Sequence, residues 1–129
     1  MSVALRITGK EWEIMRVVWE DHPITASQII LSLGQQDPTW HPKTVRTLLS
    51  RLVKKKALDY KPIGRAYVYE PKVSESECVS AVSASFLDRV FGGSLQPMLA
   101  HFVQQKALTK REIQELKRIL ENPERLDHD

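Results

Sequence analysis

Residues 40–54 read WHPKTVRTLLSRLVK, and this segment decides the fold of the chain. Proline suits the first turn of a helix, where its missing amide hydrogen is not needed, so we expect a helix that begins at Pro42. Apolar residues follow at helical spacing and predict one buried face, formed by Val45, Leu48, Leu49 and Leu52. Basic and hydroxyl side chains cover the remaining faces. The segment therefore predicts a helix that packs on a core with one side and binds a partner with the other.

Positive charge gathers in and just after this helix. The chain of 129 residues has a formal net charge of only +3, so the distribution of charge is more informative than its total. Between residues 43 and 65, eight lysines and arginines accompany one acid, Asp59. Such a cluster indicates a surface for nucleic acid, although an ordinary solvated surface can have the same composition.

Two shorter helices are expected before Pro42. The sequences TGKE at residues 8–11 and TASQ at residues 25–28 have the capping-box form, in which a hydroxyl and a Glu or Gln three residues later satisfy free amides at a helix start. Apolar residues recur at helical spacing after each of them. We predict one helix from Gly9 to Asp21 and a second helix that Gly34 terminates.

A β-hairpin is expected after the basic helix. Segments 57–61 and 66–70 are rich in strand-forming residues, and the sequence PIGR between them has turn chemistry. Three helices followed by a hairpin is the order of a winged helix-turn-helix, in which the third helix enters the major groove of DNA and the hairpin touches the adjacent backbone or minor groove. The expected fold class is thus mainly α with a small β-hairpin wing.

The nine side chains that we expect to contact DNA lie on the basic helix and the hairpin. Residues at the start of such a helix reach base edges, whereas later ones contact phosphate. The set is Lys43, Thr44, Arg46, Thr47, Ser50, Arg51, Lys54, Lys55 and Arg65. A plainer alternative remains for two groups: lysines 54–56 could simply complement the dipole of the helix C-terminus, and Arg65 could be an ordinary exposed turn residue.

Three amphipathic helices are expected in the last part of the chain, over residues 74–91, 95–106 and 109–122. Only about 55 residues follow the hairpin, a length at which a separate domain is marginal. We therefore expect a homodimer whose interface includes Phe86, Val90, Leu95, Met98, Leu99, Phe102, Ile113, Leu116, Ile119 and Leu120. The expected organisation is a DNA-binding domain at 1–73, a dimerisation domain at 74–122 and a flexible tail at 123–129.

The remaining residue types argue against other classes of protein. No motif supports catalysis or a small-molecule substrate, and we expect no cofactor. Cys78 is the single cysteine, and the four histidines, at positions 22, 41, 101 and 128, are too scattered for a tetrahedral metal site. Neither a membrane-spanning run nor a secretory signal is evident, so we expect a cytoplasmic protein. Helical or strand spacing assigns five aromatic residues to the core rather than to base stacking: Trp12, Trp19, Trp40, Tyr67 and Tyr69.

The start of the basic helix, with the pattern W-x-P-K-T-x-R-T-L at residues 40–48, resembles the penicillinase repressor family of BlaI/MecI type. The segments EWEIM at residues 11–15 and EIQEL at residues 112–116 extend this resemblance over nearly the whole chain. It implies a winged-helix homodimer that binds a palindromic double-stranded operator and represses β-lactamase or related antibiotic-resistance genes.

The resemblance also implies a mode of induction. In the family, a membrane-bound metalloprotease sensor triggers cleavage within the dimerisation segment, and the corresponding bond here is His101–Phe102. Best-known members have Asn where this chain has His101. The plainer alternative to a cleavage site is that Phe102 is a dimer-core residue and His101 a surface residue. From the residues alone, a winged-helix module whose basic face binds an acidic protein is the other functional hypothesis.

Overall fold

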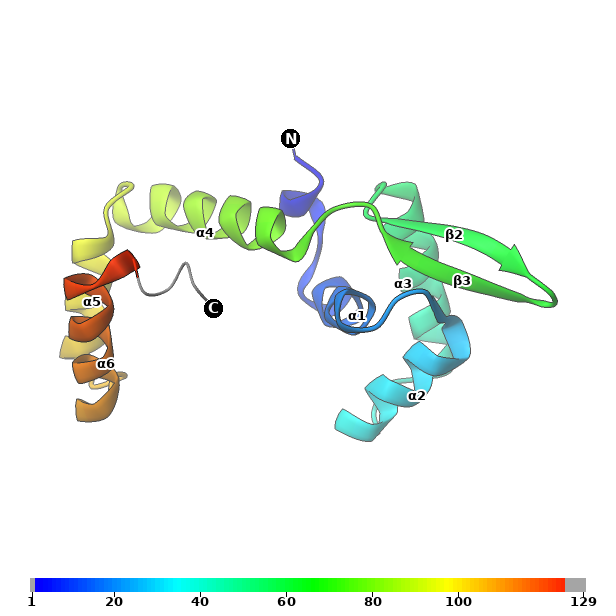
Figure 1. Cartoon of the computed structure of the whole chain (residues 1–129), viewed down its shortest axis with the longest axis horizontal. Helices are drawn as coiled ribbons and strands as arrows, with labels where there is room; N and C mark the ends of the chain where they lie inside the picture. Colours follow the sequence, from blue (N-terminus) through cyan, green and yellow to red (C-terminus); the bar gives the residue numbers. More distant parts are fainter. Residues whose placement is uncertain (1, 125–129) are drawn as a thin grey trace. The chain divides into compact units, whose positions relative to one another are not determined.

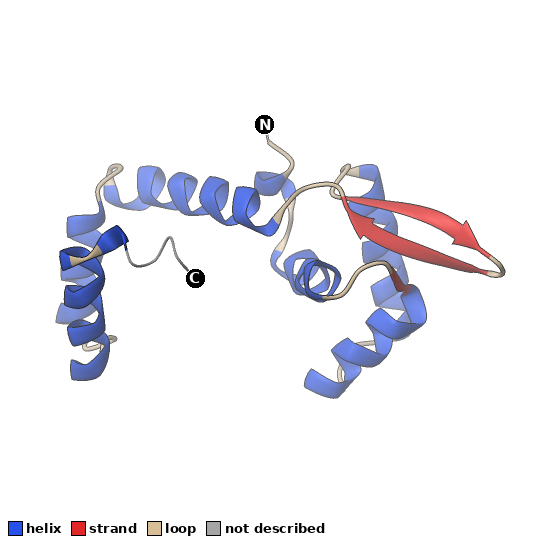
Figure 2. Cartoon of the chain, in the orientation of Figure 1, coloured by secondary structure: helices blue, strands red, loops and turns tan. Residues whose placement is uncertain are grey.

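The computed structural model describes residues 2–124, so the end of the expected tail, with His128, lies outside the described residues. The chain is mainly helical and divides after Ala84 into two compact units. Figures 1 and 2 show the elements: a 3₁₀ turn, Ala4–Arg6, then α1 Gly9–Glu20, β1 Ile24–Thr25, α2 Ala26–Gln36, α3 Pro42–Lys54, β2 Leu58–Ile63, β3 Ala66–Pro71, α4 Glu75–Phe91, α5 Leu95–Gln104 and α6 Lys110–Glu121. This is the expected fold class.

The first unit contains the core. Helices α1, α2 and α3 contribute most of its fully buried side chains, and the start of β2 closes it with Leu58. The four apolar residues predicted for the buried face of α3 are all buried. Burying a Val, Leu or Ile side chain stabilises a fold by about 1.5–3 kcal/mol, so this face anchors α3 firmly in the unit.

The sheet has three antiparallel strands in the order β1-β3-β2, one more than the expected hairpin. The extra strand is Ile24–Thr25, which pairs with Tyr69 and Val68 of β3. Strands β2 and β3 are longer than predicted, and their outer half extends away from the helices of the first unit (Figure 1). The hairpin is therefore supported by the core at one end only.

The prediction that Gly34 terminates the second helix is wrong. Helix α2 continues through Gly34 to Gln36, and the amide of Asp37 closes it on the carbonyl of Leu33. A glycine inside a helix costs only about 1 kcal/mol relative to alanine, and burial of Leu33 two turns after the capping box outweighs that cost. Two other ends differ slightly from expectation: α1 stops at Glu20 and α5 at Gln104.

Helix α3 ends in a tight backbone motif. Lys56 has a left-handed conformation with a φ of 68°. Its amide donates to the carbonyl of Val53, and the amide of Ala57 donates to that of Leu52, which is the Schellman arrangement. The motif reverses the chain so that Ala57 and Leu58 return to the core. Lys106 ends α5 in the same way.

A buried ion pair joins the two ends of this core. Glu11 is 0% exposed, and its Oε1 accepts hydrogen bonds from the Thr8 amide (2.9 Å) and from Lys55 Nζ (2.6 Å). Lys55 Nζ also donates to the carbonyl of Arg6 (2.9 Å), and Arg6 Nη2 donates to the carbonyl of Lys55 (3.2 Å). Burial raises the pKa of Glu11, but the hydrogen bond and charge of Lys55 with the hydrogen bonds of Thr8 outweigh it, so the pKa lies below the ordinary value.

The second unit has no core within its described residues. From 85 to 124 no side chain is fully buried, and six large apolar side chains are exposed: Phe86, Val90, Leu95, Val103, Ile119 and Leu120. Between residues 2 and 124, no helix combines the length and the apolar character that crossing a membrane requires.

The Glu11–Lys55 pair yields a prediction about stability. Replacing Lys55 by Ala leaves a buried carboxylate without its partner, so we expect a loss of about 3 kcal/mol in the free energy of unfolding. Urea unfolding followed by tryptophan fluorescence measures this, because all three tryptophans lie in the first unit. Lys54→Ala, at the exposed neighbouring position, is the control and should change stability by less than about 0.5 kcal/mol. Equal stability of the two variants would contradict the prediction.

Candidate DNA-binding surface

The solvent face of α3 carries the expected contact residues. Its seven expected residues from Lys43 to Lys54 are all exposed. Lys43, Thr47, Ser50 and Lys54 follow one line along the helix because they are spaced by about one or two turns. Thr47 Oγ1 donates to the carbonyl of Lys43 (3.0 Å). That hydroxyl hydrogen is therefore committed to the helix, which leaves the oxygen lone pairs and the methyl group for external contacts.

A hollow lies where α2, α3 and the hairpin meet. It is lined by the start of α2, by Arg46 of α3 and by Arg65, Tyr67 and Tyr69 of the hairpin. Two guanidinium groups thus share a concave surface with a helix N-terminus, where free backbone amides and the helix dipole favour anions. Burial raises the pKa of Tyr69 despite the nearby charge of Arg46, so Tyr69 stays a neutral wall of this hollow.

Two hairpin tyrosines belong to this surface, although neither was among the residues expected to contact DNA. Tyr67 is 53% exposed rather than in the core, and Tyr60 is also exposed. Their rings pack edge to face at 5.2 Å, and both line a second hollow with Ser50 and Lys54. Tyr67 was expected inside because strand spacing normally marks a buried face, but the outer part of this hairpin has no second layer to cover it. The cross-strand register that brings Tyr60 and Tyr67 together was the missing signal.

Three of the other four expected aromatic residues do pack against the core. Trp19, Trp40 and Tyr69 are half-buried and pack against it, and Trp19 Nε1 donates to the carbonyl of Val73 (2.9 Å). Trp12 packs edge to face on Trp19 with ring centroids 5.4 Å apart.

The structure does not support the expected contact of Lys55 with DNA. We expected this lysine to contact DNA phosphate, but its ammonium group is held by Glu11 and by the carbonyl of Arg6. A cation that already neutralises a buried carboxylate is not available to a phosphate. The three neighbouring lysines therefore differ in role, and Lys54, which is exposed, remains the candidate for a phosphate contact.

The start of α3 is fixed by the residues before it. Asp37 Oδ1 accepts hydrogen bonds from the Thr39 amide (2.9 Å) and hydroxyl (2.7 Å), and these bonds lower the pKa of Asp37. Lys10 Nζ lies 4.7 Å from the ring centroid of Trp40. His41 is the N-cap residue, and its Nδ1 accepts a hydrogen bond from the Lys43 amide at 3.1 Å. This role of His41 was not evident from the sequence, because histidine is not among the preferred capping residues.

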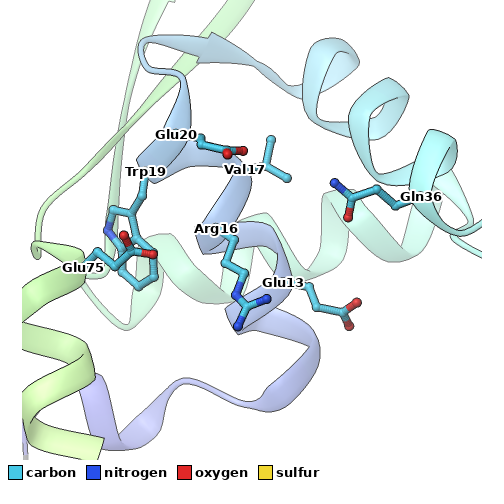
Figure 3. A pocket seen from close by; sticks show the side chains of 7 residues that line it. All are labelled: Glu13, Arg16, Val17, Trp19, Glu20, Gln36 and Glu75. Carbon is cyan, nitrogen blue, oxygen red and sulfur yellow. The ribbon is translucent and has the colours of Figure 1, made fainter. Parts of the chain in front are cut away.

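Another hollow, on the outer side of α1, has the opposite charge. Figure 3 shows its lining residues, which include Glu13, Glu20 and Glu75 with the single cation Arg16. Carboxylates repel phosphate, and the lining includes no residue of α3 or of the hairpin. This hollow is therefore a poor candidate for binding DNA.

The described residues give no sign of other chemistry. From residue 2 to residue 124, no three His, Cys, Asp or Glu side chains come together in a way that could hold a metal ion. Cys78 is buried, and burial together with the charge of Glu77 raises the pKa of its thiol. The thiol therefore stays protonated and unreactive near neutral pH.

The residues expected at a dimer interface are all in the second unit. Met98, Leu99, Phe102, Ile113 and Leu116 are half-buried, whereas the other five, from Phe86 to Leu120, are exposed. The His101–Phe102 bond lies inside α5, with the His101 ring 6.1 Å from that of Phe91 and 5.8 Å from that of Phe102.

Comparison with known proteins gives consistent matches. The family model described as penicillinase repressor matches residues 7–122. The penicillinase repressor of Bacillus licheniformis is 40% identical over 116 residues, which cover 90% of each chain. The methicillin resistance regulatory protein MecI of Staphylococcus aureus (strain N315) is 35% identical over 114 residues, covering 88% of this chain and 92% of MecI. The solution structure of the DNA-binding domain of the repressor BlaI matches with a TM-score of 0.53 and 39% identity, over 60% of this chain and 93% of that domain.

Proposed function

The chain belongs to the penicillinase repressor family, and on that premise we propose that it represses transcription by binding a palindromic operator as a homodimer. Family members are transcriptional repressors and not enzymes. The hypothesis of a module that binds an acidic protein is therefore not favoured. Bacterial DNA lies in the cytoplasm, so we also propose a cytoplasmic location.

One observation carries the proposal: the exposed face of α3 interleaves threonines with basic residues. Arg46 and Lys43 suit guanine O6 and N7, and the methyl groups of Thr44 and Thr47 suit the thymine methyl. A surface that only attracted negative charge would not need threonines between its cations. The packed stripe on the opposite side of α3 holds these side chains in a fixed register.

Phosphate contacts are proposed on either side of the base-reading face. Arg65 and the start of α2 share the hollow with Arg46, and Lys54 shares the second hollow with Tyr60 and Tyr67. Tyrosine hydroxyls, arginines and helix N-termini all bind backbone phosphates in protein–DNA complexes. These groups would set the position of α3 in the major groove.

The second unit supports the homodimer. Its helices leave large apolar side chains exposed, and within one chain they have no core to bury them. A second copy supplies the same helices, and a twofold dimer presents two α3 helices to two half-sites. In this proposal residues 1–73 bind DNA and residues 74–122 dimerise, with α4 leading from the first unit into the second.

A comparison of Arg46→Ala with Lys54→Ala tests base reading. The DNA is the promoter of the chain's own gene, with an unrelated duplex of equal length as reference. Arg46→Ala should weaken promoter binding by about tenfold more than it weakens binding to the reference, since one good base contact is worth about 1–3 kcal/mol. Lys54→Ala should weaken both and reduce the salt dependence by about one phosphate contact. Equal losses on both duplexes for Arg46→Ala, or a wild-type protein without preference, would contradict the proposal.

Sedimentation equilibrium tests the dimer with two matched leucines. Leu120, in the second unit, is 68% exposed, and Leu31, in the first unit, is 65% exposed. Leu120→Asp places a charge in the proposed interface and should weaken self-association by about tenfold or more. Leu31→Asp should leave self-association unchanged. A monomeric wild-type chain, or equal effects of the two variants, would argue against this interface.

We also propose that cleavage of the His101–Phe102 bond, triggered by a membrane-bound metalloprotease sensor, relieves repression. Proteases bind extended chains, so α5 has to open. A helix of ten residues is only marginally stable by itself, so we expect α5 to open once its contacts with the partner copy in the proposed dimer are released. Mass spectrometry of the repressor from induced cells should find a fragment that ends at His101. An intact chain in cells where repression is relieved, or a cut at another bond, would rule out this site.

A further inference from the structure

The cap of α3 differs chemically from those of other helices in the chain. Helices α1, α2 and α6 begin with threonine capping boxes, whose hydroxyls do not change charge in water near neutral pH. Helix α3 begins with the imidazole of His41, which is exposed and accepts from the Lys43 amide. The carbonyl of His41 accepts the Val45 amide (3.1 Å), so both its side chain and its backbone hold the first turn.

An imidazole can make this bond in only one charge state. Nδ1 accepts a hydrogen bond when it is unprotonated, which places the ring proton on Nε2. The imidazolium ion donates from both nitrogens, so it cannot accept the Lys43 amide. It also brings a positive charge to the positive end of the helix dipole, where cations are unfavourable. Histidine is the side chain that ordinarily changes charge between about pH 5 and 8.

The charged groups near the start of α3 do not share this behaviour. Asp37 lies in the preceding linker, Lys10 and Glu13 of α1 pair at 3.6 Å beside Trp40, and Lys43 and Arg46 follow on α3 itself. Carboxylate, ammonium and guanidinium groups ordinarily keep their charge between pH 5 and 8. Of these groups, the imidazole is the one that caps the helix, and protonation of its Nδ1 removes the hydrogen bond from the Lys43 amide.

We propose that His41 is a positioning residue whose neutral imidazole holds the first turn of α3 for base reading, so that operator discrimination falls when His41 is protonated. The inference rests on the proposed function, because the residues held in place are the base-reading Lys43, Thr44, Arg46 and Thr47. The added charge of the imidazolium strengthens attraction to any duplex alike. Loss of the cap, in contrast, weakens only binding that depends on the exact placement of these side chains.

The ratio of the dissociation constants for the reference duplex and for the promoter isolates the effect of the cap. We expect this ratio to fall by about threefold to tenfold from pH 7.5 to pH 5.5 at constant ionic strength, which matches the free energy of an N-cap. Asparagine is a strong N-cap that does not titrate, so His41→Asn should keep the high ratio at both pH values. His41→Ala should have the low ratio at both. His22→Asn, at the other exposed histidine of the first unit, should behave as the wild type.

A pH-independent ratio in the wild type, or an equal fall in His41→Asn, would overturn the inference. A wild type that does not prefer the promoter at pH 7.5 would instead overturn the proposed function. A DNA-free measurement keeps the two apart: the Lys43 amide resonance, followed by NMR, should move with the same midpoint as the His41 ring signals. A Lys43 amide that does not follow the His41 titration would show that the cap is absent.

Discussion

Burial of one face of α3 is the constraint on which the rest of the first unit depends. A helix repeats every 3.6 residues, so fixing Val45, Leu49 and Leu52 inside also fixes which residues remain outside. The choice of residues on the exposed face of α3 is thus a consequence of core packing. The Glu11–Lys55 pair adds a second restraint, because it ties the end of α3 to the start of α1 by a short, buried contact. The buried face and the ion pair together fix the rotation of α3 about its axis and its position along that axis.

Much of this unit could be predicted from local signals in the sequence. Capping boxes, Pro42 and apolar spacing each act within a few residues, and they correctly predicted the helices and the exposed face of α3. The predictions that were wrong or incomplete concern features that depend on residues far away in the sequence. Lys55 pairs with a residue 44 positions away, and the short strand β1 exists only because β3 lies beside it. Tyr67 was misplaced because its exposure depends on how far the hairpin reaches beyond the helices.

The second unit shows a different limit of sequence reasoning. Its amphipathic helices were predicted correctly, since the apolar pattern is strong. The pattern predicts that each helix has an apolar face to bury. It does not indicate whether the surface that covers this face belongs to the same chain. With no buried side chain from 85 to 124, the apolar faces of this unit are not covered by its own described residues.

Helices α3 and α5 both end with a lysine in the left-handed conformation. That conformation strains a residue with a Cβ by about 1 kcal/mol, and glycine would adopt it without strain. Lysine returns part of this energy through its charge at the negative end of the helix dipole. At both positions the chain therefore carries backbone strain and gains a positive charge at the end of the helix. For the first unit this means that a positive charge beside α3 is retained at a cost of about 1 kcal/mol of backbone strain in the turn that leads into the hairpin.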